Sequence, residues 1–182
     1  MKNRLFVLTI TMTFIIGVAT AEGAIRVIST KGQCAYKKGR TWAPLRGGVV
    51  IPVGSKVSTG VRSQAILMVD DHKVTIKPLT MMKIYENSVK KSGSTTRLGL
   101  RRGSIRARVS RNKRIKTTFK VSTPVATSSV RGTEEEISYG PNNGMVIRVI
   151  ENSVWGESKN GIKKLITGRL RFHQKSDKSE PE

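Results

Sequence analysis

The sequence predicts an all-β fold, a single domain built from many short strands. Three observations predict it. Apolar and polar residues alternate over short runs, as they do in strands with one buried face. Gly, Pro or Asn-Gly punctuation falls about every 8–14 residues, at the spacing of turns between such strands. No stretch shows the period of 3.6 residues that a long amphipathic helix requires.

Residues 1–21 have the features of a cleaved signal peptide. Lys2 and Arg4 make a positive start, an apolar run extends from Leu5 to Val18, and Ala19-Thr20-Ala21 fits the small-x-small cleavage pattern. The apolar run is shorter than the roughly 20 residues that a membrane span needs. We therefore expect an exported protein in the periplasm or cell envelope of a bacterium, or secreted, with no transmembrane segment in its mature chain.

The mature chain is predicted to hold one all-β domain over residues 22–172, followed by a polar tail over residues 173–182. Cys34 is the single cysteine, so the protein cannot form an internal disulfide, although export favours them. Because Cys34 lies in an alternating run, we interpret it as a small buried hydrophobe rather than a reactive thiol.

Three regions show the strand pattern in order along the chain. Residues 64–86 predict an apolar strand, a polar turn at Asp70-Asp71 and a second strand. Residues 98–124 predict a strand with one apolar and one basic face. Residues 144–158 predict a further strand, in which both alternating sets are largely apolar.

Residues 32–48 and 152–168 resemble one another without a gap. In both, an alternating apolar run leads into a polar turn, and a leucine and a glycine follow at matching places (Leu45 and Leu165, Gly48 and Gly168). This similarity favours either coils of a solenoid or duplicated hairpins. Chance similarity between two hairpins is an equal alternative.

The segment "VSTPVATSSVRGT" at residues 121–133 carries a family resemblance. It resembles the FecR domain, known from iron-transport regulators and from stand-alone exported proteins, whose signature is V-x-TP-x-A followed by V-RGT. The resemblance covers residues 25–170 and implies a twisted β-helix or solenoid-like all-β unit. The matching positions are Val121, Thr123, Pro124, Ala126, Val130, Arg131, Gly132 and Thr133.

The resemblance implies that Thr123, Pro124, Arg131, Gly132 and Thr133 form a structural corner of the fold. We expect Arg131 to satisfy buried carbonyls or to pair with one of the glutamates after it, so that Arg131→Ala lowers stability.

This sequence departs from the family at three places, of which the first is the turn Asp70-Asp71-His72, where the family usually has Asp-Gly-Ser. Glu135 stands where the family usually has an aromatic residue, and Asn152 replaces the glycine of a later turn, which is a mild change because Asn tolerates positive φ. Regulators of this family also carry a sigma-factor-binding segment and a membrane helix before the domain. Neither is expected before residue 25 here, so any signalling role would pass through a partner protein.

The residues that could carry catalysis are few, and we predict no enzyme, no metal site and no cofactor. Asp70, Asp71 and His72 could together hold a cation, but an exposed polar turn explains them more simply. Glu134 and Glu136 share one face of a strand and could form an acid–base pair. On a basic protein, an internal complement to neighbouring positive charge is the better interpretation.

Charge is the strongest physical feature of the chain, which has 34 Lys and Arg against 12 Asp and Glu and a net charge of +22. Between Glu86 and Glu134 there is no acidic residue. A positive field there would gather anions, and arginine favours a bidentate grip on phosphate or carboxylate. The alternative is a solvated face that only keeps the protein soluble. The predicted binding residues are Arg97, Arg101, Arg102, Arg106, Arg108, Arg111, Lys113, Arg114 and Lys116.

Two functions are consistent with these features. The first is an envelope binding or scaffolding module whose basic face contacts lipid headgroups, lipopolysaccharide, an acidic polymer or an acidic protein. The second is an accessory in periplasmic signal transduction, contacting another exported protein through a strand edge. Nucleic acid is not an expected partner, because export separates the chain from it and few aromatic residues are available for stacking.

Overall fold

The computed structural model describes residues 23–111, 116–168 and 171–176, and these residues form fifteen strands. The predicted signal peptide lies outside the described residues. Within the described part the structure is all-β, as the sequence predicts, and it holds no helix that could cross a membrane.

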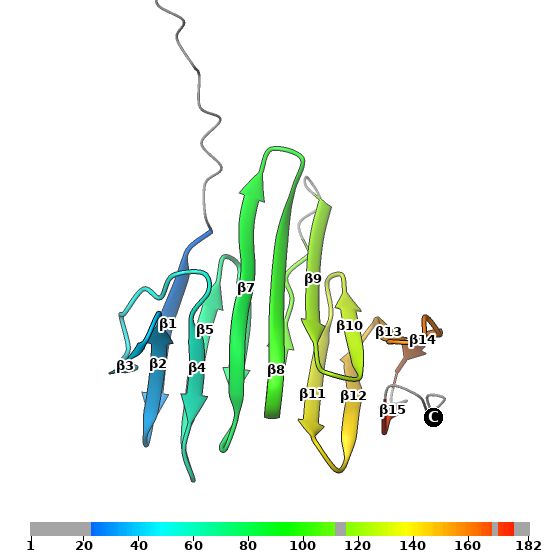
Figure 1. Ribbon diagram of the computed structural model, residues 1–182. Coiled ribbons are helices and arrows are strands. Elements are labelled where there is room, and N and C mark those ends of the chain that lie inside the picture. The colour runs from blue at the N-terminus through cyan, green and yellow to red at the C-terminus, as the bar shows by residue number, and fades with distance from the viewer. Residues whose placement is uncertain (1–22, 112–115, 169–170, 177–182) are drawn as a thin grey trace, which may run out of the picture.

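One layer, here called sheet A, has nine strands in the order β14-β13-β10-β9-β8-β7-β4-β2-β3. Figure 1 shows β7, β8 and β9 side by side through the middle of the molecule. The strands of sheet A are β2 (Cys34–Lys38), β3 (Thr41–Pro44), β4 (Lys56–Thr59), β7 (Met81–Lys90), β8 (Gly93–Arg108), β9 (Lys116–Ser122), β10 (Ala126–Val130), β13 (Ser153–Ser158) and β14 (Lys163–Thr167).

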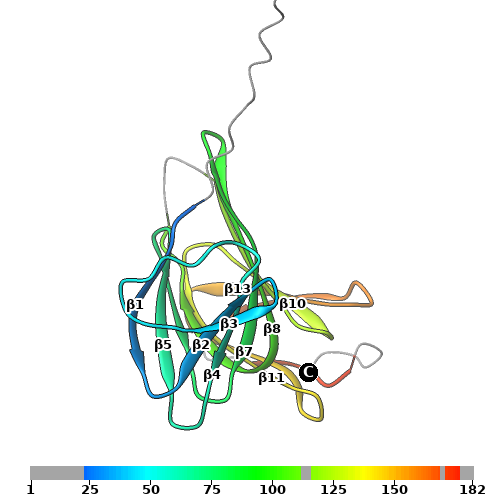
Figure 2. The same ribbon diagram turned by 60° about the vertical axis from the view of Figure 1, so that its left-hand side comes forward.

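The second layer, sheet B, has the order β1-β5-β6-β8-β11-β12-β15. In Figure 2 the layers are seen from the side, with β1 and β5 away from β7, β8 and β10. Its other strands are β1 (Ile25–Lys31), β5 (Gln64–Val69), β6 (His72–Ile76), β11 (Glu134–Gly140), β12 (Gly144–Glu151) and β15 (Arg171–Gln174).

Strand β8 belongs to both sheets. Its first half pairs with β7 and β9, and its second half pairs with β6 and β11. The change occurs at Gly103, which has φ of 95°. A side chain there would meet Thr80, whose Cα lies 2.5 Å from the position of a Cβ, so the bend requires glycine.

The hydrophobic core lies between the sheets. Inward-facing residues alternate along each strand, so that Ile105 and Ala107 of β8 are buried while Arg106 and Arg108 are exposed. The bulkiest fully buried side chains are Phe119 of β9 and Phe172 of β15. Burial of this alternating apolar set is the main favourable term in folding such a chain.

The ladders do not confirm the solenoid part of the predicted fold. Among the described strands only β8 and β9 pair in parallel, and every other ladder is antiparallel. A solenoid stacks successive coils in parallel, whereas tight turns such as Asp70-Asp71 reverse this chain into hairpins. Asp70 accordingly has φ of 50°.

The two similar segments form hairpins at opposite edges of sheet A, β2–β3 and β13–β14. Their matching leucines differ in environment, because Leu45 is 3% exposed and Leu165 is 44% exposed. The similarity therefore extends to the hairpin and not to the packing of the leucine that follows the turn.

Two other predictions concern the ends of the domain. Strand β15 continues through His173 and Gln174, so it runs two residues into the predicted tail, because it pairs with β12 and buries Phe172. Cys34 is buried, as interpreted, and its thiol donates to the carbonyls of Lys31 and Gln64. Burial raises the pKa of this thiol.

Candidate functional site

The predicted basic run does not form a single face. Because β8 passes from one sheet to the other at Gly103, Arg97 lies on the outside of sheet A and Arg106 and Arg108 lie on the outside of sheet B. Arg101 and Arg102 are exposed beside the bend, Lys116 is exposed in β9, and Arg111 follows β8. Lys113 and Arg114 lie outside the described residues.

On sheet B the arginines are already paired. Arg106 Nε is 2.5 Å from Glu134 Oε1, and Arg108 Nη2 is 2.8 Å from Glu134 Oε2. Burial alone would raise the pKa of Glu134, but hydrogen bonds from the two arginines outweigh it and hold the pKa below its ordinary value. Glu134 is therefore an internal complement to positive charge.

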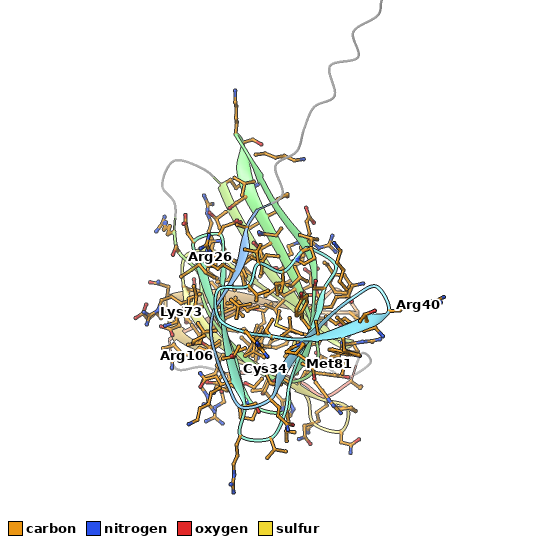
Figure 3. All side chains as sticks on the ribbon, turned by 90° about the vertical axis from the view of Figure 1, so that its left-hand side faces the viewer. Arg26, Cys34, Arg40, Lys73, Met81 and Arg106 are labelled. Atoms are coloured by element: carbon orange, nitrogen blue, oxygen red, sulfur yellow. The ribbon has the colours of Figure 1, made fainter. Side chains whose placement is uncertain are left out.

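A polar hollow of about 380 Å³ lies beside this pair and is lined by Lys73, Lys77, Arg106, Arg108 and Glu134 among others. Lys77 pairs with Glu136 at 2.7 Å. Figure 3 shows Arg26, Lys73 and Arg106 along one side of the molecule, away from Arg40 at the tip of the β2–β3 hairpin. Glutamates thus neutralise much of the charge around this hollow.

On sheet A a row of lysines crosses neighbouring strands. The ladders place Lys37 of β2 opposite Lys56 of β4, and Lys56 opposite Lys83 of β7. Trp42 continues the row at one end, opposite Lys37, and Gly99 of β8 continues it at the other, opposite Lys83. These residues alternate with buried ones such as Val57 and Met82, so they face outward.

A second row lies beside the first on sheet A. It joins Glu86, Arg97 and Lys120 with Ser129 and Trp155 across five strands. Arg97 Nη1 is 3.6 Å from Glu86 in a well-exposed pair, which removes little of the positive field. In the part of the chain that the structure describes, the three lysines of the first row and Lys120 form no ion pair.

We name these five cations (Lys37, Lys56, Lys83, Arg97 and Lys120) the sheet A basic face. Of these five, sequence reasoning included only Arg97 among the predicted binding residues; Lys120 lies in the same basic run, whereas Lys37, Lys56 and Lys83 lie in separate segments and form no charge run. Lys56 and Lys83 do sit between buried residues of alternating strands, and this was the available signal, whereas Lys37 lies between half-buried Tyr36 and exposed Lys38. Their assembly depends on strand order, which periodicity does not reveal.

The comparisons with known proteins agree with the fold. The family model for FecR protein matches residues 55–155. The chain belongs to the FecR family. No curated protein is significantly similar to it in sequence.

Two crystal structures of a "putative anti-sigma factor" from Parabacteroides distasonis ATCC 8503 share the fold, with TM-scores of 0.59 and 0.57. Both are 15% identical to this chain, and the match covers 70% of this chain and 57% of theirs. The FecR chain described here thus spans less than two thirds of those proteins, and at this identity the likeness concerns the fold alone.

The FecR signature residues lie around the turn after β9 and the turn between β10 and β11. Thr123 Oγ1 accepts from the backbone N–H of Ala126 at 3.1 Å and donates to the Ala126 carbonyl at 3.0 Å, closing the turn around Pro124. Gly132 has φ of 69°, and Thr133 is buried. The signature therefore stabilises the passage from sheet A to sheet B.

Arg131 does not take the role predicted for it. It is exposed, and both Glu134 oxygens are held by Arg106 and Arg108 instead. The register of β11 explains this, since it places Glu134 directly opposite Arg108. Asn152 fits its position, with φ of 60° and a side-chain amide that donates to the Gly132 carbonyl.

Glu135, which replaces the usual aromatic residue of FecR domains, points into the core. It is fully buried, Ser128 Oγ donates to its Oε2 at 2.6 Å, and its Oε1 has no hydrogen-bond partner among the described residues. Burial raises its pKa to about 8, against the opposing effect of the Ser128 hydrogen bond. Glu135 is thus a neutral carboxylic acid at pH 7.

His72 lies in the first position of β6 and is buried, although the sequence placed it in the turn. Its Nδ1 accepts from the Ser110 backbone N–H at 3.3 Å, and its ring meets Phe119 edge-on. Burial lowers its pKa despite the nearby Asp70 and Asp71. Within the described residues, no group of three or more His, Cys, Asp or Glu side chains is placed to hold a metal.

Proposed function

We propose that this protein is a non-enzymatic, exported FecR module that contacts an anionic component of the bacterial envelope through the sheet A basic face. The observation that carries the proposal is the alignment of Lys37, Lys56 and Lys83 on three neighbouring strands, beside Arg97 and Lys120. Neighbouring strands are about 4.8 Å apart, so these charges form a compact field.

Such contact is peripheral and sensitive to salt. Exposed charges act over a distance of roughly 10 Å at 0.1 M salt, and the described strands offer no amphipathic helix to insert into a bilayer. On sheet B, by contrast, Glu134 already pairs with Arg106 and Arg108, and Glu136 pairs with Lys77. Sheet A is therefore the better surface for an external anion.

Membership of the FecR family and the shared fold of the anti-sigma-factor structure support a place in signal transduction. In this proposal the module holds an envelope anion and reports to another exported protein. A strand edge is the alternative contact, in which the partner adds a strand to sheet A. The end strand β14 favours it, because its outer edge is unpaired among the described strands and Leu165 is exposed.

Charge reversal on one sheet tests the anion contact. The variant Lys56→Glu/Lys83→Glu/Lys120→Glu should no longer sediment with isolated envelopes or phosphatidylglycerol vesicles at low salt. The matched control, Arg26→Glu/Lys73→Glu/Arg148→Glu, changes the net charge equally on the outside of sheet B, where all three residues are exposed. Equal loss of binding in both variants, or in neither, would overturn the assignment of the site to sheet A.

Crosslinking in the native envelope tests the strand-edge alternative. A protein captured in stoichiometric amount through β14, unchanged by the sheet A charge reversals, would favour it. Substituting Leu165 of β14 with proline should abolish that capture, because it removes a backbone N–H from the outer edge, whereas the N–H of Gly168 in the same alternation faces Asn152 on the β13 side. Capture of lipid or polysaccharide alone would contradict this alternative.

A further inference from the structure

Exposed aromatic side chains gather on one face of this molecule. Among the described residues three aromatic side chains are well exposed, namely Trp42 (44%), Tyr85 (50%) and Trp155 (51%). All three lie on the outside of sheet A, on β3, β7 and β13. Sheet B exposes no comparable ring within the described chain. Exposed rings on one face can stack on the rings of a ligand, which makes this face a candidate binding surface.

The edge of the Tyr85 ring packs closely against the backbone of β8. A register shift in β7 lets Tyr85 lie over Gly99, where a Cβ would fall 2.2 Å from the ring. Lys83 Nζ lies 4.8 Å from the centroid of this ring, and Lys37 Nζ lies 5.8 Å from that of Trp42. Each of these two rings thus carries a cation beside it, and Gly99 is the residue that leaves room for Tyr85.

A shallow hollow of about 490 Å³ lies between the strands of Tyr85 and Trp155. Residues with hydroxyl groups make up half of its lining, and the other half consists of Arg97, Lys120 and the two acidic residues Glu86 and Glu157. Two of the hydroxyl groups, those of Ser122 and Thr127, are 3.0 Å apart. Exposed hydroxyls, carboxylates and cations give a surface many fixed donors and acceptors at low conformational cost. The lining includes Thr95, Arg97, Thr118, Lys120, Ser122 and Thr127.

From these features we infer that the outside of sheet A binds an anionic polysaccharide, an inference that rests on the proposed function and names its ligand class. Sugar rings lie on the aromatic side chains, their hydroxyls bond to the hollow, and their acidic groups meet the lysines. Tyr85 and Trp155 are four ladder steps apart, roughly 19 Å at 4.8 Å a step, so an extended polymer can reach both.

A lipid surface fits these features less well. Headgroup phosphates need the cations alone, and they leave both the hydroxyl-lined hollow and the aromatic rings unused. Single-stranded nucleic acid would use rings and cations. It offers few hydroxyls to a hollow lined by Ser and Thr. Binding of a lipid surface and binding of single-stranded nucleic acid are therefore both outcomes of the test.

The two tryptophans of the chain are Trp42 and Trp155, so intrinsic fluorescence reports directly on this face. Polygalacturonate and dextran sulfate are titrated into the purified protein, with neutral dextran as the uncharged control. Binding should change the tryptophan emission for the two anionic polymers and not for dextran. Tyr85→Ala/Trp155→Ala should weaken binding by about tenfold, read from the remaining Trp42 or by sedimentation.

Two matched variants separate stacking from other effects. Trp155→Phe keeps a ring and should bind within about twofold of the unchanged protein, whereas Leu165→Ala removes an exposed apolar neighbour of Trp155 and should have no effect. Loss of polymer binding on charge reversal of Lys56, Lys83 and Lys120, together with these results, would support both proposals.

Several results would overturn the inference. If neither anionic polymer binds, or if Tyr85→Ala/Trp155→Ala binds them unchanged, the face does not recognise polysaccharide. Vesicle binding that still depends on Lys56, Lys83 and Lys120 would then leave the proposed function standing. Tighter binding of a thirty-residue oligo(dT) than of either polymer would assign the face to single-stranded nucleic acid. If neither vesicle binding nor polymer binding depends on Lys56, Lys83 and Lys120, both proposals are overturned.

Discussion

Glu134 and Glu135 are neighbours in β11, but they face opposite sides of the strand and experience opposite environments. Glu134 lies on the outer side of sheet B, where Arg106 and Arg108 bond to both of its oxygens. Glu135 lies on the inner side among apolar residues, and only Ser128 bonds to it. The same side chain is therefore an anion in one place and a neutral acid one residue further on.

The difference shows how burial and partners act separately on one chemical group. Burial disfavours the charged form of both glutamates, and for Glu135 nothing outweighs it, so the pKa rises to about 8. For Glu134 two guanidinium groups reverse the sign of the shift, and the pKa falls. The stability contributions of the two residues must then depend on pH in opposite directions.

The largest effect is expected where Glu134 loses its partners. Arg106→Ala/Arg108→Ala leaves Glu134 without counter-charges, and because removal of these half-exposed arginines also lets water reach the carboxylate, the melting temperature should fall by about 5 °C. Adding Glu134→Gln to this variant removes the uncompensated charge and should recover most of the loss. Thermal unfolding followed by circular dichroism measures both changes.

A control on the same face separates pairing from a general loss of arginine. Arg148 and Arg171 are opposite one another in β12 and β15, are exposed, and form no ion pair within the described residues. Arg148→Ala/Arg171→Ala should leave the melting temperature nearly unchanged. An equal fall of the melting temperature in this control would show that the loss of stability does not come from the pairing of Glu134 with Arg106 and Arg108.

The next effect concerns Glu135 and the pH. Its pKa is raised on folding, so its contribution to stability is complete below the ordinary carboxyl value of 4.5 and is lost as the pH rises to about 8. His72 has a lowered pKa, and its contribution is lost only as the pH falls through and below 6.5. The interval from pH 6.5 to 8 therefore isolates Glu135.

Across that interval the free energy of unfolding should fall on the order of 2 kcal/mol. Glu135→Gln cannot titrate, so its stability should stay level between pH 6.5 and 8, as urea unfolding at a series of pH values would show. Above pH 8 the unchanged protein should reach a plateau. A slope that persists in the Gln variant would mean that another group is responsible.

Much of the fold follows from local pattern. The alternation of Ile105 and Ala107 with Arg106 and Arg108 predicts their opposite faces, and the Asp70-Asp71 turn follows from local backbone preferences. These features depend on a few adjacent residues. The strand period of two is enough to predict the opposite faces of β8, whereas the turn follows from its residue types and the Thr123-Pro124 corner from the family resemblance.

The sites depend on contacts between distant segments, which local pattern does not specify. The crossing of β8 at Gly103 divides the arginines between two faces, and strand order brings Lys37, Lys56 and Lys83 into one row. The antiparallel ladders likewise replace the solenoid coils that the family resemblance implies. The sequence marks Glu135 as a departure from the family, but its burial beside Ser128 depends on how the two sheets pack.

The smallest effect is expected at Arg131. It is the arginine nearest in sequence to Glu134 and Glu135, but within the described residues it bonds to neither. The structure places it in solvent, so Arg131→Ala should change the free energy of unfolding by less than about 0.5 kcal/mol. Gly132→Ala is the matched control at the next position, where φ is 69° and a Cβ would lie 2.6 Å from Arg111 Cβ. It should destabilise by roughly 1 kcal/mol or more, because alanine resists that backbone conformation. If urea unfolding instead finds Arg131→Ala as damaging as loss of Arg106 and Arg108, Glu134 is held by charges along the chain rather than across the sheet.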